Sequence, residues 1–458
     1  MRRIPRPPNE TECKIEPARN ENLIVQVREY ELITPLFGGG VEPGQCDDLT
    51  PIRGTEIRGH LRFWWRATRG GRYRDDLDSM RRDESLIWGG ASAAGDPRPS
   101  QVQIAVEKRA SGQPKTYSDL DRELQYAGFP LQEGNKAVLV GVKFAVRISF
   151  PREIELVDDG GNKIFFENLL SEVEAALWAW ETFGGIGART RRGFGALHCT
   201  KINQNPCSFA DDTTTPIAVQ NSIRAGLRTH LIKGDWPKDV PYLSNEIFYY
   251  RFTPSKRSAN DAWKAIISSL KRFRQHRPGY GRSRWPEPDA IRKATGQWLK
   301  SGVKAAGHPG HAPDPKNSGK FPRAAFGLPI VFHFKDADER NPNREPRDVL
   351  LKLDSHDRMA SPLILRPIRM SEQRYFGLAV LLNGTLQPED FCSDDIDLVL
   401  TEKDGRKKIV SQLKAKLSEA EAKSIKRVDS GGPLFGEETD PLLAFLNEIQ
   451  KEITKDER

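Results

Sequence analysis

Five glycines and three arginines stand within the twelve residues from Gly184 to Gly195. Glycine permits backbone conformations that other residues avoid and lets a ligand approach closely, and arginine carries a permanent positive charge that suits phosphate. The stretch predicts a clamp on a phosphate backbone, and the alternative is a helix C-cap at Gly184 or Gly185 followed by a flexible basic loop. The predicted contacts are Gly185, Gly187, Arg189, Thr190, Arg191, Arg192 and Gly193.

A second basic group lies on a predicted helix over residues 55–69. Its four arginines are spaced by four, four and three residues, so they form one stripe along the helix. Glu56 is the acidic residue nearby, since the acidic segment 75–84 is expected to be exposed. The cations would repel each other unless anions covered them, which favours contact with a polyanion over an ordinary solvated face. The stripe consists of Arg58, Arg62, Arg66 and Arg69.

Two more segments are candidate contact surfaces. The glycine-rich loop over residues 37–51 is long, and loops of this length inside a domain are often functional; its candidates are Gly38, Gly39 and Gly40. A basic run over residues 271–284 predicts either another electropositive surface or a solvated helix end, and its sequence leaves both open. The basic run contains Lys271, Arg272, Arg274, His276, Arg277, Arg282 and Arg284.

Catalysis is the main alternative to binding. Asp47, Asp48 and His60 could supply a general base for attack by an RNA 2′-hydroxyl, with arginines stabilising the phosphorane. The simpler interpretation is that the two aspartates form a polar turn and that His60 lies at the edge of the core. His308 and His311 have metal-compatible spacing but no carboxylate or cysteine close by. We therefore predict no catalytic residue, no metal site and no cofactor.

Periodic patterns indicate the elements that hold these groups. Strands are predicted at 23–33, 102–106, 137–150 and 194–199, and helices at 55–69 and from a capping box at Ser171 and Glu174 onward. The apolar face of the first helix, which includes Trp64 and Trp65, is expected to pack in the core and not to stack on bases. The order strand, helix, strand, strand, helix, strand is typical of the ferredoxin-like, RRM-like βαββαβ fold.

The second half predicts a further, degenerate ferredoxin-like domain with helical insertions, so the fold class is α+β. Its strands are expected at 328–334, 349–353, 363–367 and 375–382, and an amphipathic helix near 409–425 in the tail. The predicted boundaries are residues 20–202 for the N-terminal domain, 215–400 for the C-terminal domain and 401–458 for a helical tail.

The amino-acid composition gives weaker evidence about the class of protein and its partners. The chain has 458 residues, with 71 Lys and Arg against 63 Asp and Glu, and this net charge of +8 is compatible with a polyanionic partner. Five cysteines contain no C-x-x-C pair, so neither a disulfide framework nor a cysteine zinc site is indicated. No apolar run is long enough to cross a bilayer. We expect a cytoplasmic protein with no membrane partner.

Several motifs together resemble the RAMP superfamily of CRISPR RNA-binding proteins, and within it the first-subunit family of the type III-B (Cmr) effector complex. The similar segments are Thr34 to Gly40, Pro51 to Ala67 with its tandem tryptophans and regular arginines, Gly184 to Gly195, Gly327 to Ile330, and Arg358 to Leu363. The matches cover about residues 30–380 in islands. The segment 235–320 and the tail beyond 385 have no counterpart.

The resemblance implies a non-enzymatic RNA-binding subunit in antiviral defence. It implies contact with the 3′ part of the CRISPR guide RNA, with the complementary target RNA and with the neighbouring RAMP subunit of the complex. It adds Arg53 and Arg358 to the candidate RNA contacts. Two alternatives stay open: a RAMP endoribonuclease that cuts with a loop aspartate or a histidine, and a scaffold that binds only proteins.

Overall fold

The structure is a computed structural model of the chain. It describes residues 22–38, 46–47, 49–90, 99–152, 154–157, 163–166, 169–207, 216–244, 250–253, 255–277, 281–301, 310, 312–338, 341, 343–354, 358–371, 374–384, 398–405 and 407–456. The candidates Gly39, Gly40, Asp48, His308 and His311 lie outside these residues. The chain mixes helices with antiparallel sheets, as predicted.

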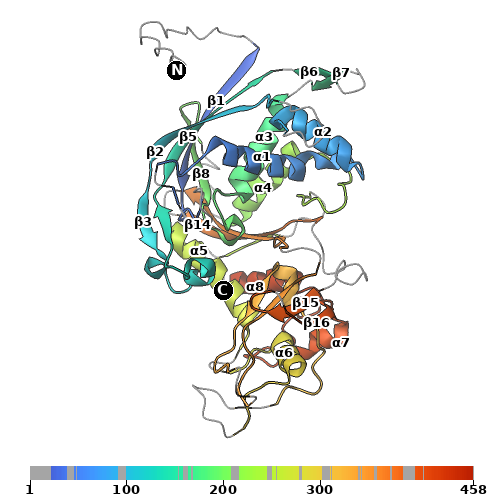
Figure 1. Ribbon diagram of the computed structural model, residues 1–458. Helices are drawn as coiled ribbons and strands as arrows, with labels where there is room; N and C mark the ends of the chain where they lie inside the picture. Colours follow the sequence, from blue (N-terminus) through green and yellow to red (C-terminus); the bar gives the residue numbers. More distant parts are fainter. Residues whose placement is uncertain are drawn as a thin grey trace, which may run out of the picture.

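An antiparallel sheet around β1 (Leu23–Leu32) organises the N-terminal half (Figure 1). The other elements of this half are α1 (Gly54–Arg69), α2 (Leu77–Trp88), β2 (Gln103–Ala110), β3 (Gln113–Thr116), β4 (Ala137–Val140), β5 (Lys143–Pro151), β6 (Ile154–Val157), β7 (Lys163–Phe166), α3 (Leu169–Phe183), β8 (Leu197–Ile202) and β9 (Asn205–Pro206). The strand order in the sheet is β2-β5-β1-β8-β9. The predicted order of strands and helices is present in β1, α1, β2, β5, α3 and β8, with α2 and two small hairpins added.

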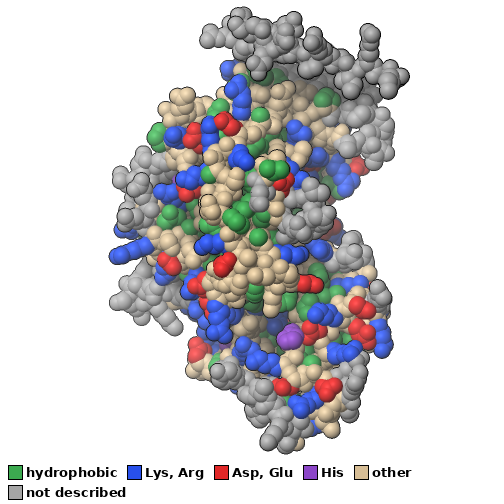
Figure 2. Space-filling model, turned by 60° about the vertical axis from the view of Figure 1, so that its left-hand side comes forward, with side chains coloured by type: hydrophobic (Ala, Val, Ile, Leu, Met, Phe, Trp, Pro, Cys, Tyr) green, Lys and Arg blue, Asp and Glu red, His purple; other side chains and the backbone are tan. Residues whose placement is uncertain are grey.

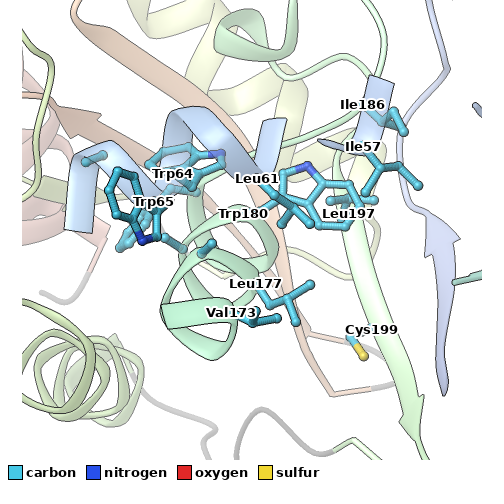
Figure 3. Close-up of a cluster of buried hydrophobic side chains, with 14 of the residues drawn as sticks. Ile57, Leu61, Trp64, Trp65, Val173, Leu177, Trp180, Ile186, Leu197 and Cys199 are labelled. Atoms are coloured by element: carbon cyan, nitrogen blue, oxygen red, sulfur yellow. The ribbon is translucent and has the colours of Figure 1, made fainter. Parts of the chain in front are cut away.

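Helices α1 and α3 pack on each other over this sheet, and Figure 3 shows the core that they share. Ile57, Leu61 and Trp65 of α1 are 0% exposed, and Trp64 is 3% exposed. Trp180 of α3 points into the same cluster. Full burial of a large apolar side chain contributes about 1.5–3 kcal/mol. The assignment of both α1 tryptophans to the core is confirmed.

Two local predictions in this half are wrong. Helix α3 begins at Leu169, so Ser171 lies inside the helix and is not its N-cap; Glu174 instead pairs with Arg28 at 2.6 Å. The strand predicted over 137–150 is two strands, because Gly141 has a φ of +79° and turns the chain between β4 and β5. β4 then pairs with β3 in a separate ribbon.

The second half contains a smaller sheet that packs against helices. Its elements are α4 (Pro216–His230), β10 (Tyr250–Phe252), α5 (Ala259–Gln275), β13 (Leu363–Ser371), β14 (Arg374–Leu381) and α8 (Pro441–Asp456). The strand order is β10-β14-β13, α5 packs on β13 and β14, and α8 packs on β10.

The remaining strands form a sheet of their own, at the lower end of the molecule in Figure 1. This sheet has the order β11-β12-β15-β16, and its elements with their neighbours are α6 (Glu287–Thr295), β11 (Ile330–Phe332), β12 (Val349–Leu353), β15 (Leu398–Glu402), β16 (Lys408–Leu413) and α7 (Glu419–Ser424). The prediction that residues 328–382 form one sheet is therefore wrong.

The helix predicted over 409–425 is also wrong. Residues 408–413 form β16, and the helix α7 covers only 419–424. Leu413 pairs with Leu398 and Val410 pairs with Leu400 on the neighbouring strand. A short apolar run fits either periodicity, and here the pairing with a distant strand decided it.

Candidate nucleic-acid interface

A cleft of about 1950 Å³ lies between the N-terminal half and the lower part of the second half. Its lining residues lie within 37–38, 117–136, 188–192, 271–292, 323–335, 345–348 and 358–361, together with Lys403. Its lining contains fourteen lysines and arginines against two acidic residues, Glu345 and Asp348. Figure 2 shows lysine and arginine side chains above and below the waist of the molecule.

Nine of these cations have no carboxylate within 4.0 Å among the described residues. The other five, which are Lys271, Arg282, Arg292, Arg323 and Lys403, form ion pairs. Unpaired positive charge facing a cleft attracts a polyanion, because field lines concentrate there. The nine are Arg122, Lys136, Arg189, Arg191, Arg192, Arg274, Arg277, Lys335 and Arg358.

The glycine-arginine loop makes a compact turn in one wall of this cleft. Gly187, Gly193 and Gly195 have φ values of +83°, +86° and +58°, a region that favours glycine. Gly184 and Gly185 do not adopt the left-handed conformation of a C-cap glycine. The turn η5 (Thr190–Arg192) carries Arg191 and Arg192, and Arg189 precedes it as its N-cap. A helix cap alone therefore does not account for the sequence.

The three loop arginines donate to main-chain carbonyls. Arg189 Nε donates to the carbonyl oxygen of Ala127 at 2.6 Å, and Arg191 donates to that of Ser361. Arg192 donates to the carbonyls of Leu363 at 3.3 Å and Phe326 at 3.1 Å. The loop thus joins the N-terminal half to the second half as well as lining the cleft.

Burial affects the charge state of this loop. Desolvation lowers the pKa of Arg192 to about 9 and the pKa values of Arg189 and Arg191 to about 10. All three remain protonated at neutral pH, with no carboxylate among the described residues to balance them. A bound anion would restore the missing counter-charge.

The arginine stripe of α1 has anionic partners that the sequence did not suggest. Glu84 of α2 is 2% exposed, and its Oε1 lies 2.5 Å from Arg62 Nε and 2.9 Å from Arg66 Nη1. Arg69 lies 3.6 Å from Glu172 of α3. The expectation that segment 75–84 is exposed is wrong at Glu84, because α2 turns this carboxylate toward α1. Repulsion within the stripe therefore no longer argues for a polyanion.

The sequence candidates separate into two groups in space. Gly38, the loop 188–192 and Arg358 all line the cleft, although they lie far apart in the sequence. Arg53, which precedes α1, and the α1 candidates Arg58, Arg62 and Arg66 do not line it, and neither do Gly185, Gly187 and Gly193. Gly187 N–H donates to Glu56 Oε1 at 2.8 Å, which ties the loop to α1.

The suspected catalytic residues that the structure describes lie outside the cleft lining. Asp47 Oδ1 accepts hydrogen bonds from the backbone N–H groups of Leu49 and Thr50, and bonds from Thr50 lower the pKa of Asp47. Asp47 thus forms the polar turn of the simpler interpretation. Burial lowers the pKa of His60 to about 4, in a separate pocket of about 380 Å³ that also contains Glu56.

The neutral His60 gives a pH prediction. An unfolded histidine binds a proton below about pH 6.5, whereas folded His60 does so only near pH 4, so acidification through this window destabilises the fold. The substitution His60→Gln should reduce the loss of unfolding free energy between pH 6.5 and 5 by up to about 2 kcal/mol. Urea unfolding of wild type and His60→Gln at both pH values measures this. An equal loss in wild type and His60→Gln would refute the prediction.

Several cleft residues were missed by the sequence reading. Arg122, Lys136, Phe129 and Lys335 stand singly in segments without a motif, and only the fold brings them together. Within the described ranges, no cluster of His, Cys, Asp or Glu could hold a metal ion. The described helices include none that is long and apolar enough to cross a membrane.

Comparisons with known proteins show which family and which relatives the chain is similar to. Residues 29–198 match the model of the RAMP superfamily. The CRISPR system Cmr subunit Cmr1-1 of Pyrococcus furiosus is 24% identical over 349 residues, which cover 74% of this chain and 82% of that protein. Cmr subunit Cmr1-2 of the same organism is 24% identical over 195 residues, which cover 38% of this chain and 95% of that protein.

Solved structures of similar chains include Cmr1 from Pyrococcus furiosus in its apo form, with a TM-score of 0.43, 15% identity and coverage of 78% of this chain and 88% of that one. A chain in the type III-B Cmr-beta complex bound to cognate target RNA has a TM-score of 0.44 and 13% identity, over 78% of this chain and 94% of its own. Residues 29–198 therefore match the RAMP superfamily, and the chain resembles the Cmr1 subunits of type III-B CRISPR systems.

Proposed function

We propose that this protein is a non-catalytic RNA-binding subunit of a type III-B CRISPR-Cas (Cmr) effector complex. It contacts the 3′ part of the guide RNA and the target RNA, and it docks on a neighbouring RAMP subunit in antiviral defence in the cytoplasm. The observation that carries the proposal is the cleft, which is lined by fourteen basic and two acidic residues. The relatives, which are Cmr subunits, support the same assembly.

The chemistry of the cleft suits RNA held by its backbone. Arginine and lysine neutralise phosphates without reading sequence, which is appropriate where base pairing by a guide supplies the specificity. We propose Gly38, Arg358 and the loop 188–192 as contacts there, together with Arg122 and Lys136. The α1 arginines Arg53, Arg58, Arg62 and Arg66, and the loop glycines Gly39, Gly40, Gly185, Gly187 and Gly193, remain predicted contacts.

The finer fold assignment is also a proposal. Two ferredoxin-like domains would account for the order β2-β5-β1-β8 in the first half and for β10, α5, β13, β14 and α8 in the second, where a fourth strand is missing from the described residues. We propose domain boundaries at residues 20–202 and 215–400, with residues 401–458 as the C-terminal tail that contains α8. The packing of α8 on β10 favours adding α8 to the second domain.

A charge-removal experiment tests RNA binding. The triple variant Arg122→Ala, Lys136→Ala, Arg358→Ala should lower the affinity of the full chain for guide and target RNA about tenfold. The plot of log K against log salt should become less steep by about 2, since each lost phosphate contact to single-stranded RNA reduces the size of the slope by about 0.7. Fluorescence anisotropy over a salt series measures both quantities.

The matched control removes the same charge elsewhere. Arg224, Arg228 and Lys233 are exposed and do not line the cleft, so their triple alanine variant should bind nearly as wild type. Equal losses in the two variants would show that net charge, and not the cleft, determines binding.

A cleavage assay tests the ribonuclease alternative. The reconstituted complex is incubated with labelled target RNA, and we expect the substitutions Asp47→Ala and His60→Gln to leave the rate of RNA cutting unchanged. Loss of cutting in either variant would favour the ribonuclease alternative.

A further inference from the structure

Among the residues that line the basic cleft is an exposed aromatic side chain, Phe129. Phe129 is 56% exposed and lines the cleft, whereas most large apolar side chains of the described chain are buried. Val331, which is 39% exposed, also lines the cleft. A single exposed apolar side chain is common on protein surfaces, so the significance of this ring depends on the residues around it.

The backbone that carries Phe129 is held firmly. The turn η4 (Phe129–Leu131) follows Gly128, where an added Cβ would lie 3.2 Å from Leu131 and 3.3 Å from Phe194. Ala127 and Leu131 are buried in the core cluster that contains Phe194. Arg189 donates to the carbonyl of Ala127. The ring is therefore presented to the cleft by a fixed turn, which reduces the entropy lost on binding.

The surroundings of the ring are basic and aromatic. Arg122 is exposed and Lys136 is half-buried on the same segment, and neither has a carboxylate partner among the described residues. Tyr117 and Tyr126 line the cleft beside them. A basic groove with aromatic rings on which bases stack is the arrangement that binds single-stranded nucleic acid.

A double-stranded RNA would offer Phe129 no base on which to stack. Bases in an RNA duplex are stacked on each other, so a protein meets phosphates, 2′-hydroxyls and base edges. The apolar face of Phe129 would then lie against charged groups, which would lose hydrating water without gaining a hydrogen-bond partner from the ring. An unpaired base, in contrast, offers a flat face that matches the ring.

We infer that the cleft takes single-stranded RNA and that Phe129 stacks on an unpaired base, while Arg122 and Lys136 bind the adjacent phosphates. This inference rests on the proposed function, since it specifies the form of the RNA that the cleft binds. The cleft volume of about 1950 Å³ is roughly two to six times that of a pocket for one small ligand, which leaves room for several nucleotides of one strand.

The test compares an unpaired RNA oligonucleotide with the same sequence in a perfect duplex, using the full chain. Phe129→Ala should weaken binding of the single strand about 5- to 150-fold, the loss that follows from about 1–3 kcal/mol per stacked base. It should leave the salt slope unchanged, because no charge is lost. Phe129→Trp should restore affinity, and Ile217→Ala, which removes an exposed apolar side chain on α4, should have no effect.

The outcomes separate this inference from the proposed function. A 2-aminopurine base in the oligonucleotide should be quenched by wild type and by Phe129→Trp but not by Phe129→Ala. Equal affinity for strand and duplex, with no effect of Phe129→Ala, would overturn the stacking inference while leaving RNA binding intact. Failure of wild type to bind either RNA would overturn the proposed function itself.

Discussion

Replacing Gly195 with alanine is expected to lower the free energy of unfolding by about 3 kcal/mol or more. Gly195 has a φ of +58°, and a Cβ at this position would lie 1.9 Å from the carbonyl oxygen of Ile186. That oxygen belongs to the backbone, so no side-chain rotation can relieve the overlap. Two main-chain hydrogen bonds would be strained, from Ile186 N–H to Gly195 O at 2.9 Å and from Gly195 N–H to Pro35 O at 2.8 Å.

The measurement is urea unfolding followed by tryptophan fluorescence, with RNA binding assayed in parallel. Displacement of the loop should weaken RNA binding as well, because the loop residues 188–192 line the cleft. Gly59→Ala is the matched control: Gly59 lies inside α1 with nothing within 4 Å of an added Cβ. It should stabilise the protein by about 0.5–1 kcal/mol. Equal stability of the two alanine variants would show that the loop tolerates a side chain at 195.

Arg366→Met is expected to destabilise the protein by about 3–5 kcal/mol, since it removes a buried cation from a set of buried acceptors. Arg366 on β13 is 1% exposed and donates to the carbonyls of Gly184, of Glu181 at 3.0 Å and of Leu197 at 2.6 Å. These acceptors belong to the end of α3 and to β8. One side chain of the second half thus satisfies three carbonyls of the first.

Arg369→Met provides the control for this prediction. Arg369 lies on the same strand, but its side chain is 22% exposed and its contact with Glu31 is 3.5 Å long. Its loss should cost at most about 1 kcal/mol, as for other solvent-accessible ion pairs. Arg366→Lys should recover only part of the stability, because one ammonium cannot reproduce the guanidinium fork. Similar midpoints for Arg366→Met and Arg369→Met in thermal unfolding would contradict the prediction.

Local periodicity was enough to predict the main helices and strands of the N-terminal half, but not the start of α3 or the break at Gly141. The spacing of Ile57, Leu61 and Trp65 indicated which face of α1 is buried, because helical periodicity is a local property. The glycines of the 184–195 loop indicated unusual backbone conformations, and three of them have positive φ. The resemblance to the RAMP superfamily rested on the same local motifs.

The ion-pair partners of the charged residues and the position of the cleft follow from long-range contacts that local patterns do not indicate. Glu84 forms ion pairs with both Arg62 and Arg66, and Arg191 of the loop donates to the carbonyl of Ser361 in the second half. Likewise, the strand 408–413 took its form from pairing with β15. Ion pairs, strand pairings and a cleft wall join residues far apart along the chain, and periodicity carries no information about such distances. For this reason Phe129, an isolated aromatic residue in the sequence, became a candidate RNA contact only when the fold placed it in the same cleft as basic residues from distant segments.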